Sequence, residues 1–256
     1  MSASAHVEQV NRPELSFVFP VFDEERNIGK VIQSARQIGE DLNRDFEVIV
    51  VDDGSRDSSP HIISKWTKTD TRIRGVRHAH NAGYGAALRS GLAAAKGDLV
   101  FFSDSDLQFD LSEIRHLLAH TRDFDIVAGY RFPRRDPWHR IAIARVWRRI
   151  VQSLFGLRVR DIDCAFKLFH RRVIDGVALA SVGAFINTEL LVRAKAAGFR
   201  IREVPVTHRR RQHGTQTGAH PRVLVRAVLE LGSLYRELRQ AARSKRTPSP
   251  SRANLG

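Results

Sequence analysis

Two aspartates separated by one residue, Asp104 and Asp106, follow directly on an apolar run at residues 99–102, and Gln108 lies two residues further on. A continuously apolar run is typical of a parallel strand that is buried on both faces. Ligands of open α/β sheets bind beyond the carboxyl ends of the strands, and carboxylate and amide oxygens suit Mg²⁺ or Mn²⁺. The spacing fits a metal site, and equally a turn in which the aspartates cap a helix that begins near Leu111.

A second acidic pair, Asp52 and Asp53, ends another apolar run, and Gly54 after it permits a tight turn. Carboxylates at such a strand end can bind the base or the ribose hydroxyls of a nucleotide. Taken alone, the pair also fits an ordinary strand-to-helix turn with an Asp or Ser cap. The glycines of residues 81–89 would allow close backbone approach to a ligand, but this segment has neither the G-x-G-x-x-G pattern nor a P-loop.

Short apolar runs alternate with longer helical periodicities between residues 15 and 128, which predicts a parallel sheet covered by helices. Right-handed crossovers would place the carboxyl ends of the first, second and fourth strands along one edge. That edge would collect both acidic pairs together with residues 22–24. Strands are expected at 15–20, 46–52, 73–77, 99–103 and 125–128, and helices at 27–42, 59–67, 83–95 and 111–120.

The second half of the chain is less regular, and two amphipathic helices are expected there, at 137–157 and 221–238. Each has an apolar stripe beside an arginine-rich face. Packing of the stripe against the core is the favoured interpretation, and a helix lying at a membrane interface, which would also suit Trp138, is the alternative. The stripes are Ile143, Val146, Trp147, Ile150 and Leu154, and Leu224, Val228, Leu231, Tyr235 and Leu238.

The composition indicates a folded, strongly basic protein. The chain has 256 residues, 42% of them hydrophobic, and a formal net charge of +14. That charge favours anionic partners, namely nucleic acid, acidic lipid head groups or phosphorylated small molecules. No helix-turn-helix, RNP or zinc-finger pattern is present, so nucleic acid is the least favoured of the three. No stretch resembles a signal peptide or a membrane-spanning helix, which predicts a cytoplasmic protein, free or peripheral on the cytoplasmic face of the membrane.

Three motifs, in this order, resemble the family 2 glycosyltransferases of the GT-A fold: residues 19–28 (FPVFDEERNI), 47–55 (EVIVVDDGS) and 97–108 (GDLVFFSDSDLQ). Later segments at 129–131, 161–167, 189–191 and 203–208 resemble the dolichol- or polyprenyl-phosphate mannosyltransferase branch and its bacterial glucose-transferring relatives. The resemblance implies one α/β, Rossmann-like GT-A domain over residues 14–240. Its nucleotide-sugar half would be 14–130 and its acceptor half 131–240, between a flexible N-terminus (1–13) and a disordered basic tail (241–256).

The resemblance also implies roles for individual residues. Asp104, Asp106 and Gln108 match the metal-binding D-x-D-x-Q of the lipid-phosphate branch, with Ser105 at a position of the nucleotide-sugar site where Ala is common. Arg131 and Arg211 match arginines that meet phosphate groups of the acceptor or donor, and Asp104, Asp106 and Arg131 would form the catalytic set. Positions that hold the base and ribose correspond to Pro20, Phe22, Glu24, Val51, Asp52 and Asp53.

Some positions depart from the family pattern. Gln216 and Thr217 stand where the loop H-x-x-R-x-x-G-x-S-K has Ser and Lys, which removes one expected phosphate contact. Asp23 stands where Asn is usual, and Ala165 where Gly is usual. These departures leave the expected fold unchanged and weaken the assignment of the substrate.

The reaction that the resemblance implies is an inverting, metal-dependent transfer of a hexose from GDP-mannose or a UDP-sugar to a polyprenyl or dolichyl phosphate. Mg²⁺ or Mn²⁺ would be the cofactor. The expected partners are the nucleotide-sugar donor, the lipid-phosphate acceptor, and a membrane surface or a separate membrane protein. The alternative within the family is transfer to a soluble sugar or natural-product acceptor.

Overall fold

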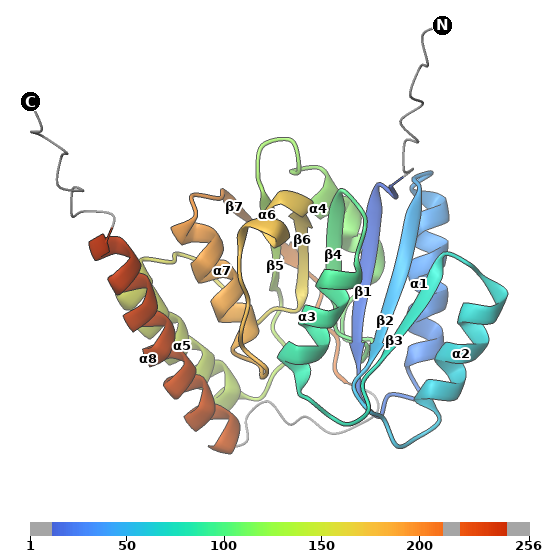
Figure 1. Cartoon of the computed structure of the whole chain (residues 1–256), viewed down its shortest axis with the longest axis horizontal. Helices are drawn as coiled ribbons and strands as arrows, with labels where there is room; N and C mark the ends of the chain where they lie inside the picture. Colours follow the sequence, from blue (N-terminus) through green and yellow to red (C-terminus); the bar gives the residue numbers. More distant parts are fainter. Residues whose placement is uncertain (1–11, 212–220, 245–256) are drawn as a thin grey trace, which may run out of the picture.

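The computed structural model describes residues 12–211 and 221–244, and a single sheet runs through its centre (Figure 1). The strand order is β3-β2-β1-β4-β6-β5-β7. The sixth strand is antiparallel to both of its neighbours, and all other paired strands are parallel. The strands are β1 (Leu15–Val21), β2 (Phe46–Asp52), β3 (Ile73–Arg77), β4 (Leu99–Ser103), β5 (Ile126–Arg131), β6 (Phe166–His170) and β7 (Ile201–Val206).

The strands expected in the first half are confirmed. The bounds of β2, β3 and β4 are those predicted, β1 is one residue longer, and β5 begins one residue later and continues to Arg131. Every residue of β1, β2 and β4 is buried, as continuous apolar runs in a parallel sheet require. The predicted placement of the ends of β1, β2 and β4 along one edge follows from this order.

Helices cover both faces of the sheet. Because the chain moves outward from β1 to β3 and then returns to β4, right-handed crossovers place α3 on the face opposite to α1 and α2. Figure 1 shows α3 in front of the strands, and α5 and α8 at the end of the molecule far from β3. The helices are α1 (Ile28–Asp41), α2 (Ser59–Thr69), α3 (Tyr84–Ala94), α4 (Ile114–Leu118), α5 (Trp138–Phe155), α6 (Arg171–Gly176), α7 (Ile186–Ala196) and α8 (Pro221–Ser244).

The helix predicted at 111–120 is confirmed only at 114–118. A 3₁₀ turn, Leu111–Glu113, precedes the short α4, and the turn is capped by Asp110, whose Oδ1 accepts the Ser112 N–H at 3.1 Å. Strands β6 and β7 and helices α6 and α7 were not predicted from the sequence. In α7 eight of eleven residues are buried, including polar ones, so it has no apolar stripe by which to be recognised.

The two helices expected in the second half are present, and in α8 Leu231 and Leu238 of the predicted stripe pack against the core as the favoured interpretation predicted, although Val228 is exposed. In α5 only Val151 is buried, and most of the predicted stripe is exposed. Helix α8 continues to Ser244, past the expected start of a disordered tail at 241, whereas residues 1–11 and 245–256 lie outside the described part. In the described ranges no helix is long and apolar enough to cross a bilayer.

Candidate functional site

Three loops meet at the carboxyl edge of β2, β1 and β4, and they bring most of the predicted site residues together. Glu24, Asp52 and Asp106 are 9%, 2% and 7% exposed, although each is acidic. Buried carboxylates are rare unless they are paired or bind a ligand. The edge therefore concentrates negative charge in a place that a folded protein otherwise avoids.

The loops are fastened to one another by hydrogen bonds. Ser55 Oγ accepts the Asp23 N–H at 3.0 Å, and Asp23 Oδ1 accepts the Arg56 N–H at 2.7 Å. The Ser105 hydroxyl donates to the Pro20 carbonyl at 2.7 Å, which joins the ends of β4 and β1. Asp23 has φ +53°, a left-handed conformation that Asp and Asn both tolerate. The replacement of the usual Asn at this position is therefore compatible with the loop.

Asp104 is one of four described residues that have a buried side-chain polar atom without a hydrogen bond. Its Oδ1 is buried and has no hydrogen-bond partner among the described residues. Burial, together with the nearby charge of Asp106, raises the pKa of Asp104 to about 7. Asp106 makes one turn contact, since its Oδ1 accepts the Gln108 N–H at 3.1 Å, and burial raises its pKa as well. The capping alternative fails for Asp104, because the helical turn that follows is capped by Asp110.

Two residues that were assigned no role, Tyr84 and Lys167, lie close enough to Asp104 to affect its pKa. The Tyr84 hydroxyl is buried, and burial together with the charge of Asp104 raises the Tyr84 pKa well above its usual value. The fully buried Lys167 donates from Nζ to Asn187 Oδ1 at 3.1 Å and to the carbonyls of Ile162 and Cys164. Lys167 stands inside the apolar run FKLF, and a lysine in a buried strand was the available signal in the sequence.

Arg211 reaches the same edge from the segment after β7. Its guanidinium forms ion pairs with Glu24 Oε1 and, at 3.4 Å, with Asp106 Oδ2. Gln108 lies alongside, where its Nε2 donates to the Arg209 carbonyl at 3.0 Å. Arg211 was predicted to bind phosphate, and in this arrangement it neutralises the carboxylates. His213, Gly214, Gln216 and Thr217 of the same loop lie outside the described residues.

The donor atoms present suit a divalent cation without enclosing one. Across the described ranges, no three His, Cys, Asp or Glu side chains converge as a ready metal cluster. Asp104 and Asp106 supply carboxylate oxygens, and Gln108 supplies an amide oxygen. Of the carboxylate oxygens, Asp104 Oδ1 has no hydrogen-bond partner among the described residues. Hard oxygen donors of this kind fit Mg²⁺ or Mn²⁺, which keep several coordination positions for water or substrate phosphate. The residues therefore fit the group that the sequence implied.

Arg131, predicted to contact phosphate, is occupied by the protein itself. Its Nε and Nη2 donate to the two oxygens of Asp161 at 2.6 and 2.7 Å, and its Nη1 donates to Asp136 at 3.1 Å. The Arg131 side chain is 11% exposed. Its bidentate pair with Asp161 fixes the end of β5 against the loop that contains Asp161. In this arrangement all three guanidinium nitrogens donate to carboxylates.

The predicted nucleotide-binding acids differ from each other. Asp52 Oδ1 accepts the Ser55 N–H at 2.9 Å, whereas its buried Oδ2 accepts no hydrogen bond among the described residues, although Arg77 Nε lies 3.2 Å away. Val51 is fully buried in the core, so only its backbone is available, whereas Phe22 is 41% exposed at the rim. Asp52 Oδ2 is thus ion-paired with Arg77 and accepts no hydrogen bond from the described residues.

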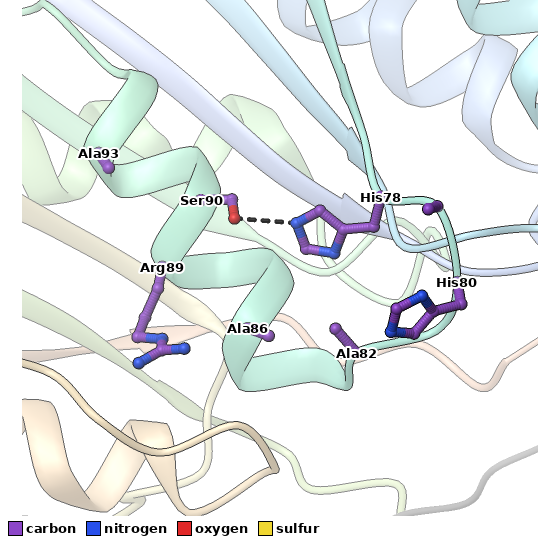
Figure 2. Close-up of a pocket in the computed structure, with 8 residues that line it drawn as sticks. His78, His80, Ala82, Ala86, Arg89, Ser90 and Ala93 are labelled. Carbon is purple, nitrogen blue, oxygen red and sulfur yellow. Dashed lines mark hydrogen bonds between the residues drawn. The ribbon is translucent and has the colours of Figure 1, made fainter.

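Asp53 instead organises the loop before α3. Its oxygens accept the N–H groups of Ala82 and Gly83 at 2.9 and 2.8 Å and meet His78 Nδ1 at 2.6 Å. Figure 2 shows the other ring nitrogen of His78 turned toward Ser90 on α3, at 2.9 Å. His78, Ala82 and Ser90 line a pocket of about 600 Å³, to which α3 also contributes Ala86 and Ala93. Asp53 therefore stabilises the loop that precedes α3.

The glycine-rich segment 81–89 does allow a close backbone approach, but the approaching group is the protein's own chain. The Val182 carbonyl accepts the N–H groups of Gly85 and Ala86 at 2.9 and 3.3 Å. A Cβ on Gly85 would lie 2.6 Å from the Gly183 carbonyl oxygen. The N-terminus of α3 is therefore closed by residues 181–183 and is not offered to a phosphate.

Replacing Gly83 by alanine is expected to destabilise the protein strongly. Gly83 has φ +104°, and a Cβ added at this position would clash with the Val182 carbonyl oxygen. Gly198→Ala is the matched control, because Gly198 has φ +90° but nothing within 4 Å. The control isolates backbone strain, about 1–2 kcal/mol, and Gly83→Ala should cost about 1–3 kcal/mol more in urea unfolding. Equal losses for the two variants would contradict the proposed close packing.

Comparison with known proteins gives the site a context. The sequence model described as "Glycosyl transferase family 2" matches residues 16–177. The undecaprenyl-phosphate 4-deoxy-4-formamido-L-arabinose transferase of Aeromonas hydrophila subsp. hydrophila is 31% identical over 202 residues. The matched region covers 78% of this chain and 61% of that protein, so the chain spans about three fifths of the relative's length.

Solved structures extend the likeness to the fold. Glucosyl-3-phosphoglycerate synthase from Mycobacterium tuberculosis in complex with UDP superposes with a TM-score of 0.68 at 22% identity, covering 88% of this chain and 80% of that one. Its complex with Mn²⁺, UDP and glucosyl-3-phosphoglycerate gives a TM-score of 0.62 at 22% identity, over 94% and 82%. These relatives share the α/β GT-A fold with its mostly parallel sheet. The chain belongs to glycosyl transferase family 2.

Proposed function

We propose that the protein transfers a hexose from a nucleotide-diphosphate sugar to a polyprenyl phosphate. One observation carries this proposal. Two carboxylate oxygens, Asp104 Oδ1 and Asp52 Oδ2, are buried at the ends of β4 and β2, the strands on either side of β1, and accept no hydrogen bond from the described residues. Buried polar atoms are satisfied in nearly all native structures, so each of them calls for a ligand. A nucleotide diphosphate with its cation would meet both oxygens.

The donor would lie across the ends of β2, β1 and β4. Asp52 and Glu24 would accept hydrogen bonds from the base and ribose, and Phe22 at the rim would cover the base. Asp104 and Asp106, with Gln108 through Oε1, would hold Mg²⁺ or Mn²⁺ beside the diphosphate. The ion, when bound, supplies Lewis-acid stabilisation of the charge that develops on the leaving nucleotide.

A phosphate monoester acceptor explains why no protein base is needed at this edge. Such a phosphate is anionic near neutral pH, so it can attack the anomeric carbon without losing a proton to the protein. Attack from the side opposite the diphosphate would invert the configuration. The protein would contribute by orienting the acceptor, and Arg211 is the described cation closest to the acids of the site. The named activity of the Aeromonas relative supports a lipid phosphate.

A soluble phosphorylated acceptor is the second candidate. The structural relatives include complexes of a synthase with phosphoglyceric acid and with glucosyl-3-phosphoglycerate. The two acceptors differ in the chemistry they require, because a phosphate oxygen attacks without losing a proton, whereas a glycerate hydroxyl would need a base to take its proton. Product analysis by mass spectrometry with undecaprenyl phosphate or 3-phosphoglycerate as acceptor separates the two candidates.

The donor site is tested by thermal denaturation with GDP, UDP and dTDP, each with and without Mn²⁺. One nucleotide should raise the melting temperature in a Mn²⁺-dependent manner, because a ligand at a hundredfold excess over its Kd stabilises the native state by about 2.7 kcal/mol. Asp106→Asn should remove the Mn²⁺-dependent part of the shift. Absence of any shift at millimolar nucleotide would reject the donor site and with it the proposed transfer.

A further inference from the structure

Large apolar side chains that remain exposed gather on α5 and α8. Of ten such residues in the described part of the chain, five lie on α5 and three on α8. Their exposure runs from 39% at Leu154 to 81% at Trp138. Isolated exposed hydrophobic residues are normal, but a concentration on two neighbouring helices indicates an interaction surface. The eight residues are Trp138, Ile143, Val146, Ile150 and Leu154, and Val225, Val228 and Leu229.

On α5 the exposed residues from Ile143 to Leu154 follow a spacing of three, four and four, which places them in one stripe along the helix. The helix is attached to the fold along one edge of this face, through Trp147 and Val151. Trp147 donates from Nε1 to Thr188 Oγ1 at 3.1 Å, its ring meets Phe185, and Val151 is fully buried. The stripe is therefore not needed to hold α5 in place.

Helix α8 is arranged in the same way. Leu231 and Leu234 are 5% and 2% exposed and face the protein, whereas Val225, Val228 and Leu229 are more than half exposed. The rings of Phe155 and Tyr235 meet at a centroid distance of 5.9 Å, so α5 and α8 lie side by side (Figure 1). Both apolar stripes thus belong to the same end of the molecule.

The charge of these helices narrows the choice of partner. Helix α5 contains no acidic residue, and its arginines are Arg140, Arg145, Arg148 and Arg149. The acids of α8 are paired within the protein, Glu230 with Arg226 at 3.3 Å and Glu237 with Arg193 at 2.7 Å. A second copy of the chain would bring a similarly basic surface against this one and be repelled. An anionic lipid surface fits both features, because apolar side chains enter the acyl boundary while arginines meet the lipid phosphates.

The position of α5 relative to the candidate site is also suitable. Strand β5 runs parallel to β4, since both are antiparallel to β6, so both end at the same edge of the sheet. The chain leaves that edge at Arg131 and enters α5 at Trp138. The exposed Trp138 therefore stands on the side of the molecule where Asp104 and Asp106 lie, and indole rings favour the membrane–water interface.

We infer that the α5–α8 face docks peripherally on an anionic phospholipid bilayer, with its apolar stripes inserted at the interface. This inference rests on the proposed function only in that a membrane would present the polyprenyl phosphate acceptor. The surface itself follows from exposure, packing and charge.

The test is co-sedimentation of the full chain with vesicles of phosphatidylcholine, alone or mixed with phosphatidylglycerol. Binding is expected to the mixed vesicles, and the double variant V146E/I150E should weaken it by at least about tenfold. The matched control is S64E/T69E, which adds the same charge at exposed positions of α2. Circular dichroism verifies that both variants fold.

Three results would overturn the inference: no binding of the parent protein to mixed vesicles, equal losses in the two double variants, or a solution dimer that V146E/I150E dissociates. Nucleotide-dependent melting shifts, measured without lipid on the same preparations, keep this test separate from that of the proposed function. Shifts without vesicle binding would refute the docking surface alone. Vesicle binding without shifts would refute the donor site alone.

Discussion

Asp106→Asn is expected to lower hexose transfer by at least about a thousandfold and to leave the protein folded. Loss of a cation-binding carboxylate would remove several kcal/mol of stabilisation of the leaving diphosphate, and each 1.36 kcal/mol is a factor of ten in rate. The folded state should not suffer. Two buried carboxylates one residue apart repel each other, and this repulsion contributes to the raised pKa of Asp104. We therefore expect a melting temperature equal to or above that of the parent protein.

The measurement is steady-state transfer from a labelled donor over a Mn²⁺ titration, together with a melting curve. Asp110→Asn is the matched control, because it makes the same change in the same loop, on a side chain that caps a helical turn. The control should lose at most about 1 kcal/mol of stability and keep its activity. Retention of Mn²⁺-dependent activity in Asp106→Asn would reject Asp106 as a ligand.

Arg211→Gln is expected to have effects of opposite sign on metal binding and on transfer. In the absence of ligand, the Arg211 guanidinium pairs with Glu24 and with Asp106, and Asp106 is one of the carboxylates proposed to hold the cation. Removal of this competing charge should tighten Mn²⁺ binding to the free protein by about tenfold, equivalent to roughly 1.4 kcal/mol. Transfer should nevertheless fall, because the arginine would move to the phosphates once the cation is bound.

Mn²⁺ binding is measured by calorimetry or from the paramagnetic signal of free Mn²⁺, without nucleotide or acceptor. Arg209→Gln serves as the control, since Arg209 pairs with the half-exposed Asp110 at 2.7 Å, away from Asp106. That variant should bind Mn²⁺ as the parent protein does. Weaker Mn²⁺ binding in Arg211→Gln would contradict the competition between guanidinium and cation.

The donor half of the fold could be predicted from the sequence because each parallel strand there is a continuous apolar run followed by acids. The ends of β1, β2 and β4 meet as the crossover rule requires, so Glu24, Asp52 and Asp106 were brought together correctly. The second half offered no comparable signal. Helix α7 is buried on nearly all sides, and β6 carries a buried lysine, so neither shows the periodicity of its class.

Several site details depended on contacts between distant segments. The sequence could not show that Arg131 is held by Asp161, thirty residues later, or that Val182 closes the N-terminus of α3. The sequence showed that α5 has an apolar stripe. Whether that stripe faces the core or the solvent depends on the hydrogen bond between Trp147 and Thr188 of α7. Periodicity reveals an apolar face without revealing what covers it.

The Val182 carbonyl at the start of α3 has a consequence for how enzymes of this shape can be recombined. The segment between α6 and α7 caps α3, and Glu189 holds that segment by accepting the N–H groups of Ala180 and Ser181. The predicted boundary at residue 130 therefore does not separate two folding units. A chimera that exchanges the acceptor half should retain the native match between residues 180–189 and Gly83–Gly85, or the donor half will lose the cap of its own helix.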